Sequence, residues 1–543
     1  MDLELVIANA IVIDGTGRQR FRADLGIREG KIAAIATDAP LVGRETIDAS
    51  GMAVAPGFID LHSHSEWIFP LSDHDVILAP LALQGITTVV TGQCGFSLAP
   101  VTDESIAAVD TMSEMMREEA FPYRWRSMGE LFDILERDGL FLNAATLVGH
   151  GPLRLAAMGE RASSAVPTPD ELATMCRMTR EAIREGAFGI STGLGYAPGI
   201  FAENDELVSL LKTAAAEGGI YAVHGRTYQR VSTFYPANSD IPHNVLSNRE
   251  QLDLARQAGV KLQLSHLIFF GRNTWPTYRT VLQDIDRAAD AGLDVAFDVF
   301  PYTVGNTTIS VMFPPWFLAD FRANINDPAA LRQLEAGLTG RLEVVGRHFG
   351  DIWLLWAGSV EFEPYEGLSF TAIGERLGLS GFEAYMQVAR VSGGHARILH
   401  GPFSGDGEYD EPLRTLLAHP RCAFMTDTFI TRRGKHNPAS FGTYPRVLGH
   451  YSRDLALFTL EEAVRRMTSY PAERIGLREV GRIAEGNWAD LVVFDPATVA
   501  DNTTDQRTDA PPTGIHTVLI SGQIVAREGQ VVSRQRCGRV LRC

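Results

Sequence analysis

The chain has 543 residues, and 49 lysines and arginines face 66 aspartates and glutamates, which gives a net charge of −17. Arg432, Arg433 and Lys435 form the one basic cluster, so we expect neither nucleic acid nor anionic membranes as partners. The start, MDLELVIANAIVIDGTG, lacks the basic segment of a signal peptide, and no run approaches the roughly 18 apolar residues of a membrane span. We therefore expect a cytoplasmic protein.

The two ends of the chain have the same character. Residues 3–54 and 481–538 both read as short strands punctuated by Gly and Asp. Two β-rich pieces at opposite termini most simply form one small sandwich. We predict an α/β protein in which residues 1–54 and 481–543 build a β-sandwich domain and residues 55–480 build a barrel between them.

Eight short apolar runs that end in polar residues follow one another through the middle of the chain. Each reads as a buried strand, and most are separated by segments that favour helix, such as ELATMCRMTREAIREG and REQLDLARQAG. Strands alternating with helices imply a parallel sheet, and eight such units fit one closed (β/α)8 TIM-like barrel. The runs end at His64, Cys94, His150, Thr192, His224, His266, Tyr302 and Asp427.

A long excursion separates the seventh run from the eighth. Residues 303–420 are too many for an ordinary barrel connection, and they include FPPWFLADF, DIWLLW and the predicted helix GFEAYMQVARV. Because the excursion follows the seventh strand, it starts on the face where barrels carry their active sites. We predict a lid that shapes the substrate pocket, in preference to a peripheral helical insertion.

Metal-capable side chains gather at the ends of five runs. A lone histidine in an apolar run is usually a core residue, and a lone buried cysteine is usually a small hydrophobe. Several at corresponding strand ends would be a large coincidence, and the H-x-H spacing puts both imidazoles on one strand face. Five scattered cysteines do not suggest a disulfide framework, so Cys94 is expected to be a free thiol. The set is His62, His64, Cys94, His224, His266 and Asp427.

These residue types predict a hydrolytic metal centre. Zinc prefers nitrogen and sulfur ligands and keeps one position open in catalytic sites, which fits Cys94, His224 and His266. The remaining three, His62, His64 and Asp427, would form a second, weaker divalent-metal site that the Cys94 thiolate can also reach. A bound metal lowers the pKa of its water to about 7. Asp427 could take the proton of that water and pass it to a leaving amine.

Serine hydrolysis is the competing chemistry. Gly189 to Gly193 spell G-x-S-x-G around Ser191, but the motif is short, and a Gly/Pro-rich loop follows it where a helix would be required. There is no dinucleotide-binding G-x-G-x-x-G and no P-loop. We therefore favour the metal centre.

Nine strings, spread in order over nearly the whole chain, resemble the amidohydrolase superfamily and within it the D-aminoacylase (N-acyl-D-amino-acid deacylase) group. The resemblance implies a metal-bearing barrel with a small β-sandwich, a small-molecule amide substrate and zinc. The strings are APGFIDLHSHSE, GQCGFSLAP, GHGPLR, GAFGISTGLGYAPG, VHGRTY, LSH, FPYTVGNT, TYPRVLGHYSR and GNWADLVVFDP.

Carried over residue by residue, the resemblance assigns Cys94, His224 and His266 to the tightly held zinc. It assigns His62 and His64 to the weaker site and makes Asp427 the general base. Many superfamily members use a carboxylated lysine on the fourth strand. Here that strand ends in Ser191 and Thr192, so Cys94 would be the bridging ligand, as in D-aminoacylases.

Four positions depart from the resemblance. Where the group holds the substrate α-carboxylate with Lys, Tyr, Ser and Arg, this chain has Ile268, Phe300, Asn306 and Ala439. Unless Arg432, Arg433 or Lys435 compensates, we expect an N-acyl or amide substrate without a free α-carboxylate. The alternatives are a true N-acyl-D-amino-acid deacylase, a hydantoinase-like hydrolase of cyclic amides or ureas, and a non-enzymatic barrel scaffold.

Overall fold

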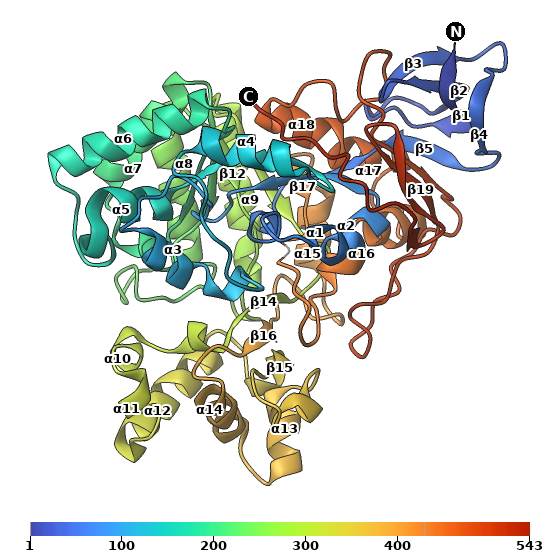
Figure 1. Ribbon diagram of the computed structural model, residues 1–543. Helices are drawn as coiled ribbons and strands as arrows, with labels where there is room; N and C mark the ends of the chain where they lie inside the picture. Colours follow the sequence, from blue (N-terminus) through green and yellow to red (C-terminus); the bar gives the residue numbers. More distant parts are fainter. Residues whose placement is uncertain (1, 428) are drawn as a thin grey trace.

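A parallel barrel occupies the centre of the computed structural model, which describes residues 2–427 and 429–543 (Figure 1). The barrel strands run in chain order around the ring, and β8 and β9 are successive pieces of one strand. The ring closes where the N–H of Asp427 donates to the carbonyl of His62 at 3.0 Å. The strands are β6 (Phe58–Asp60), β7 (Ile86–Thr91), β8 (Asn143–Thr146), β9 (Val148–Gly149), β10 (Gly189–Gly193), β11 (Ile220–His224), β12 (Lys261–Leu264), β13 (Val295–Val299) and β17 (Cys422–Phe424).

Burial on both faces explains why these strands read as continuous apolar runs. Every residue of β7 and of β13 is buried, as expected for parallel strands covered by helices outside and by one another inside. The run FLNAATLVGH differs from the prediction at its end. It divides into β8 and β9, and His150 opens α5 (His150–Met158) instead of ending a strand, because Gly149 already takes the extended N-cap conformation of that helix.

Helices wrap the outside of the barrel (Figure 1). Local signals start several of them; α6, for example, opens with a capping box in which Thr168 and Glu171 satisfy each other's backbone N–H groups. The helices around the barrel are α1 (His74–Ile77), α2 (Ala79–Leu83), α3 (Ile106–Met112), α4 (Met128–Asp138), α5, α6 (Pro169–Arg184), α7 (Asn204–Ala216), α8 (His243–Ala258), α9 (Tyr278–Asp290), α15 (Glu411–Ala418), α16 (Ala439–Arg446), α17 (Leu460–Met467) and α18 (Ser469–Ile475).

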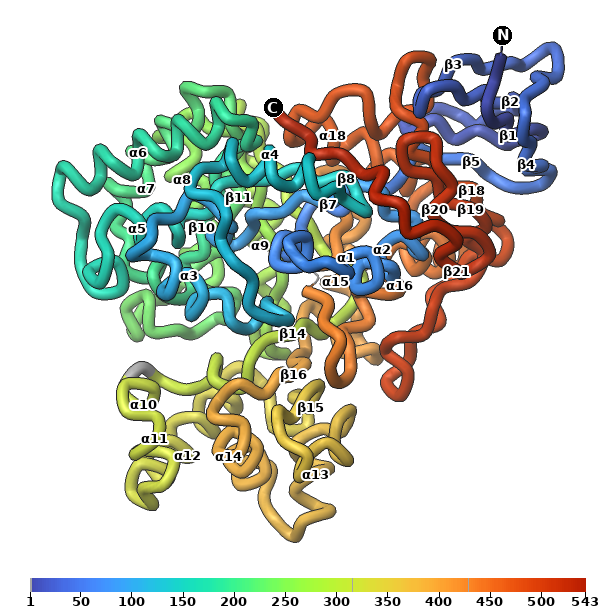
Figure 2. Tube along the Cα trace, viewed as in Figure 1, coloured from blue at the N-terminus to red at the C-terminus, as the bar shows by residue number. Residues whose placement is uncertain are grey.

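The two chain ends form one additional β domain. Its nine-stranded sheet has the order β21-β20-β19-β18-β5-β1-β2-β3, with β4 paired to β1, so the antiparallel pair β5 and β18 joins the two termini. Figure 2 shows the blue strands of the N-terminal part beside the red strands of the C-terminal part. The strands are β1 (Leu3–Val12), β2 (Phe21–Arg28), β3 (Lys31–Ala36), β4 (Gly43–Asp48), β5 (Ala53–Pro56), β18 (Leu491–Phe494), β19 (Ile515–Ile520), β20 (Gln523–Arg527) and β21 (Gln530–Val531).

The barrel with its β domain confirms the predicted fold class. The exact boundaries at residues 54 and 480 stay predictions. Among the described residues, no helix is long and apolar enough to cross a membrane.

The excursion between β13 and β17 builds a lobe that projects from the barrel (Figure 1). It has an apolar core of its own, drawn entirely from residues between Ile309 and Ile398. The predicted helix GFEAYMQVARV is α14, but a function as a lid stays a prediction. The elements of the lobe are β14 (Gly305–Thr308), α10 (Pro315–Leu318), α11 (Phe321–Asn324), α12 (Pro328–Val344), β15 (Ile352–Trp356), α13 (Phe370–Leu377), α14 (Gly381–Val391) and β16 (Arg397–His400).

Candidate metal centre

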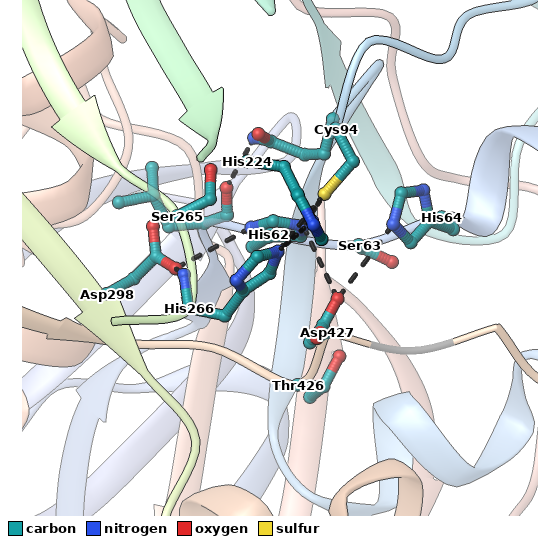
Figure 3. A network of polar contacts seen from close by, with 12 residues as sticks. His62, Ser63, His64, Cys94, His224, Ser265, His266, Asp298, Thr426 and Asp427 are labelled. Atoms are coloured by element: carbon teal, nitrogen blue, oxygen red, sulfur yellow. Dashed lines mark hydrogen bonds and ion pairs between the residues drawn. The ribbon is translucent and has the colours of Figure 1, made fainter. Parts of the chain in front are cut away.

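The predicted metal ligands converge at the carboxyl ends of the barrel strands (Figure 3). His224 is the last residue of β11, and the other five side chains lie in the short segments that follow β6, β7, β12 and β17. The converging imidazoles, thiol and carboxylate form three overlapping groups whose ligand atoms lie within 4.8 Å of one another. The groups are His62, His64 and Cys94; Cys94, His224 and His266; and His62, His266 and Asp427.

Three of these residues have a left-handed backbone. The φ angles of Cys94, His266 and Asp427 are 55°, 34° and 48°, a region that costs a non-glycine residue about 1–2 kcal/mol. Hydrogen bonds hold each one there: Tyr196 donates its hydroxyl to the Cys94 carbonyl at 2.6 Å, the His266 N–H donates to Asp298 at 2.6 Å, and the Asp427 N–H donates to the His62 carbonyl at 3.0 Å. Strain of this kind is typical of functional sites, where the surrounding structure enforces it.

Cys94, His224 and His266 come near the spacing of one tetrahedral ion, with the two imidazole nitrogens closer together than zinc would hold them. Cys94 Sγ lies 3.4 Å from His266 Nε2, and His266 Nε2 lies 2.9 Å from His224 Nδ1. Tetrahedral ligands at zinc's bond lengths are separated by roughly 3.4–3.8 Å. Cys94, His224 and His266 therefore fit zinc after shifts of a few tenths of an ångström.

A second group lies beside the first and shares its thiol. His62 Nε2 is 3.2 Å from Cys94 Sγ and 3.4 Å from Asp427 Oδ1, and His64 Nε2 is 3.9 Å from the same carboxylate oxygen. Asp427 is the most open member of this group, with 26% of its side chain exposed, whereas His62 is fully buried. Because the Asp427 carboxylate lies close to the other candidate ligands and is partly exposed, it can contact a water molecule or a substrate.

Burial shifts the pKa of three of the candidate ligands, His62, His224 and Cys94. It lowers the pKa of His62 and of His224 well below the ordinary value, with neighbouring imidazoles adding to the effect at His224, so both rings are neutral and can donate a lone pair. Burial raises the pKa of the Cys94 thiol well above its usual range, and the nearby carboxylates raise it further. A bound cation would reverse that shift, because a coordinating thiol is deprotonated.

Two buried carboxylates that sequence reasoning did not single out support the ligands. Asp298 Oδ1 lies 3.6 Å from His62 Nδ1 and accepts the His266 N–H, while Asp298 Oδ2 accepts from Gln263 at 2.8 Å. Burial raises the pKa of Asp298 to about 6. Carboxylates in this position orient ligating histidines. In the sequence, Asp298 could have been found as an acidic residue inside the apolar run LDVAFDVFPY.

The second such carboxylate is Asp60, two residues before His62. It accepts the N–H of Thr426 at 3.0 Å and the N–H of His62 at 3.3 Å, so it links the segment after β6 to the segment that carries Asp427. Burial raises the pKa of Asp60 to about 7. In the sequence, Asp60 could have been found from its position at the start of the string DLHSH, next to the two histidines.

Aromatic rings pack against two of the ligand imidazoles. Tyr228, which sequence reasoning also missed, lies with its ring centroid 5.1 Å from both His224 and His266. Tyr196 approaches His224 from another side at 5.0 Å. These rings restrict the orientations that the imidazoles can adopt.

The structure brings the four positions expected to bind substrate into one region. Phe300 and Ala439 belong to one buried apolar cluster with Phe403 and Met425, and Ile268 packs against it. Asn306 is linked to Ala439 through Asn437: Asn306 Oδ1 accepts from Asn437 Nδ2 at 3.0 Å, and Asn437 Oδ1 accepts the Ala439 N–H at 3.0 Å.

The remaining strand ends do not join the metal centre. The hydroxyl of Ser191 is buried, donates to the Gly92 carbonyl at 2.5 Å and accepts the Gly95 N–H at 2.9 Å, so it is engaged by backbone and not poised as a nucleophile. His150 Nε2 pairs with Glu206 at 2.7 Å, inside the protein.

Comparison with known proteins gives a consistent result. The family model described as Amidohydrolase family matches residues 45–312 and 370–526, and the gap falls in the lobe. The chain is 34% identical to a D-aminoacylase of Alcaligenes xylosoxydans xylosoxydans over 540 residues, which is 99% of this chain and 97% of the relative. It is 34% identical to an N-acyl-D-glutamate deacylase of the same organism over 542 residues, 99% of this chain and 96% of the relative.

A solved structure extends the comparison to three dimensions. The N-acyl-D-glutamate deacylase of Bordetella bronchiseptica, complexed with zinc and a phosphonate inhibitor that mimics the tetrahedral intermediate, superimposes with a TM-score of 0.80 at 32% identity. The match covers 100% of both chains.

Proposed function

Because this chain belongs to the amidohydrolase family, within its D-aminoacylase group, we propose that it is a zinc-dependent enzyme that hydrolyses an amide C–N bond of a small molecule lacking a free α-carboxylate. The observation that carries the proposal is the convergence of four imidazoles, one thiol and one carboxylate at the carboxyl ends of the barrel strands. Family membership establishes that the chain is an enzyme that hydrolyses C–N bonds other than peptide bonds. The identity of the metal ion and of the substrate is our proposal.

We assign the residues as follows. Cys94, His224 and His266 hold one tight zinc, and His62 and His64 hold a weaker second divalent ion. When bound, zinc lowers the pKa of water and polarises the scissile carbonyl. Elemental analysis of purified protein should find about one tightly held zinc ion per chain.

Asp427 is the proposed general acid and base. Its carboxylate is partly exposed on the ligand cluster, with Oδ1 3.4 Å from His62 Nε2. In that position it accepts a proton from the attacking water and later delivers it to the nitrogen of the departing amine. The left-handed backbone at Asp427 directs the carboxylate to this point.

The proposed substrate class rests on the neutral residues at three positions where the D-aminoacylase group holds the substrate α-carboxylate. Ile268, Phe300 and Ala439 are neutral, and the cluster around them consists of Phe, Tyr and Met side chains. A substrate carboxylate at these positions would lose its water without gaining the charged partners of the usual clamp, at a cost of about 2–5 kcal/mol. An uncharged group with an apolar substituent suits this wall.

The nearby arginines are already engaged elsewhere. Arg432 pairs with Asp73, and Arg433 Nε lies 3.4 Å from the buried carboxylate of Glu118. The backbone N–H of Lys435 donates to the β15 edge of the lobe at 2.7 Å, which ties that segment to the lobe. The two ion pairs support the view that neither arginine replaces the missing carboxylate clamp.

The second candidate is a true N-acyl-D-amino-acid deacylase. It is favoured by the 34% identity to relatives named D-aminoacylase and N-acyl-D-glutamate deacylase. In that case one of the ion-paired arginines would have to exchange its partner for the substrate.

One pair of substrates separates the two candidates. We expect kcat/KM for the amide of an N-acetyl-D-amino acid to exceed that for the free acid by at least about tenfold. Ile268→Lys combined with Ala439→Arg should shift the ratio towards the acid, whereas Ile268→Met with Ala439 unchanged should not. Efficient turnover of the free acid by the wild type, with discrimination against its amide, would establish the ordinary deacylase.

A further inference from the structure

The face of α8 that packs on the barrel is polar over its first two turns. Asn244, Ser247, Asn248 and Gln251 follow one helical stripe, and each is at most 7% exposed. A helix that covers a barrel normally presents apolar side chains here, as α8 does further on with Leu252 and Ala255. A layer of buried amides therefore lies between α8 and the strands β11 and β12.

These side chains line a small cavity. A cavity of about 30 Å³ is bordered by the polar stripe of α8, by Ser265 and by Tyr228. Several of the buried lining atoms have no hydrogen-bond partner among the described residues. They are Asn244 Oδ1, Asn248 Oδ1, Asn248 Nδ2, Gln251 Nε2 and Ser265 Oγ.

The unpaired atoms define what fits between them. More than nine in ten buried polar groups are hydrogen-bonded in native proteins, so five on one cavity imply an occupant. Two are amide donors, two are amide acceptors, and a hydroxyl can act as either. A metal cation would satisfy only the acceptors and an anion only the donors, whereas water donates and accepts. The volume suits about two water molecules.

We propose that this cavity is a permanent internal water site and that it positions two of the metal ligands. Ser265 directly precedes His266, and its N–H donates to Val223, the residue before His224, at 3.0 Å. Tyr228, whose ring packs on both imidazoles, donates its hydroxyl to the Ser265 carbonyl at 3.3 Å. Water molecules that bridge α8 to Ser265 therefore hold in place the backbone next to both His224 and His266.

Oxygen-17 magnetic relaxation dispersion tests the water site directly, because it counts water molecules that stay inside a protein. Asn248→Leu removes two of the five unpaired atoms at little change in volume. We expect this variant to lose one or more of the long-lived waters counted in the wild type. The control is Gln257→Leu on the exposed face of α8, which should keep them all. An unchanged count in Asn248→Leu would overturn the water site.

A high-resolution crystal structure of the wild type gives an answer even if that variant does not fold. Ordered density between Asn248 and Ser265 is expected. Amides that instead turn to pair with one another, with no density between them, would overturn the proposal.

Zinc retention tests the positioning role separately. Outer supports of ligating histidines typically contribute 10- to 100-fold to metal affinity. Zinc-loaded Asn248→Leu should therefore release its ion to a chelator at least about tenfold faster than the wild type and Gln257→Leu. Equal release rates would show that the waters, although present, do not position the ligands.

Discussion

Sγ of Cys94 lies 3.2 Å from Nε2 of His62, which puts a single thiol in contact with both candidate metal sites. The same sulfur is 3.4 Å from His266 Nε2 on the opposite side. A soft, deprotonated sulfur can hold an ion tightly or bridge two ions, and no other cysteine of the described chain is near these imidazoles. The thiol is therefore the residue on which the tight site depends most.

Replacing that thiol should remove the tightly held zinc. We expect Cys94→Ala to contain well below the roughly one zinc per chain of the wild type, since only His224 and His266 of the proposed tight site then remain. Elemental analysis after exhaustive dialysis measures this. Cys176→Ala, which changes a half-buried thiol on α6, should keep the metal. A Cys94→Ala protein with full zinc and activity would exclude the assignment.

Neutralising Asp427 should separate catalysis from metal binding. Asp427→Asn keeps the size of the side chain but removes the proton acceptor, so kcat should fall by about 10²–10⁴ while the tight zinc stays. Steady-state kinetics with parallel zinc analysis tests this. Asp410→Asn, at an exposed ion pair with Arg414, should have nearly native kcat. Near-native turnover in Asp427→Asn would leave the proton transfer to another group.

His74 should make the fold sensitive to mild acid. Its Nε2 accepts the Phe141 N–H at 3.1 Å and its Nδ1 donates to the Leu71 carbonyl at 3.0 Å, so the ring must stay neutral. Burial lowers the pKa of His74 below the ordinary 6.5. Below about pH 6.5 the unfolded chain therefore binds a proton that the folded chain does not, and the free energy of unfolding decreases as the pH falls.

The corresponding measurement is urea unfolding at pH 7 and pH 5. His74→Gln cannot be protonated and keeps a donor and an acceptor, so its stability should fall less between these values, by up to about 2 kcal/mol relative to the wild type. Parallel curves for the two proteins would show that His74 does not titrate on unfolding.

Arg539 should be a strong determinant of stability although it is far along the chain from its partners. Its guanidinium pairs with the buried carboxylate of Asp490 at 2.6 Å and lies 3.8 Å from the centre of the Trp488 ring. Removing one member of a buried pair leaves an unpaired charge, which costs about 3–5 kcal/mol. Arg539→Met should lose stability of this order in urea unfolding.

Two comparison variants make that prediction specific. Arg534→Met removes a mostly exposed arginine from a loose contact with Asp75 and should change stability by less than about 0.5 kcal/mol. Asp490→Asn added to Arg539→Met should recover part of the loss, because the buried charge is then gone. Equal stability of Arg539→Met and Arg534→Met would rule out a structural contribution of the pair.

The sequence by itself determined the barrel and the chemistry of its ligands. Strand periodicity and apolar runs are local properties, so the chain order of strands could be read directly, and with it the fact that Cys94, His224 and His266 come after strand ends. The residue types then pointed to zinc. The pairing of both termini in one β domain followed from two similar compositions.

Only the tertiary structure decided which distant groups meet. Asp298 contacts His62 across the barrel, and Asp60 accepts the N–H of Thr426 from the other end of the barrel sequence. Arg432 and Arg433 are engaged by acidic partners more than 300 residues earlier in the chain. The polar cavity behind β12 likewise depends on how α8 packs. The distances between these groups are set by closure of the barrel and by side-chain packing. Both bring together residues that are far apart along the chain, and the spacing of such residues in the sequence does not reveal that they are in contact.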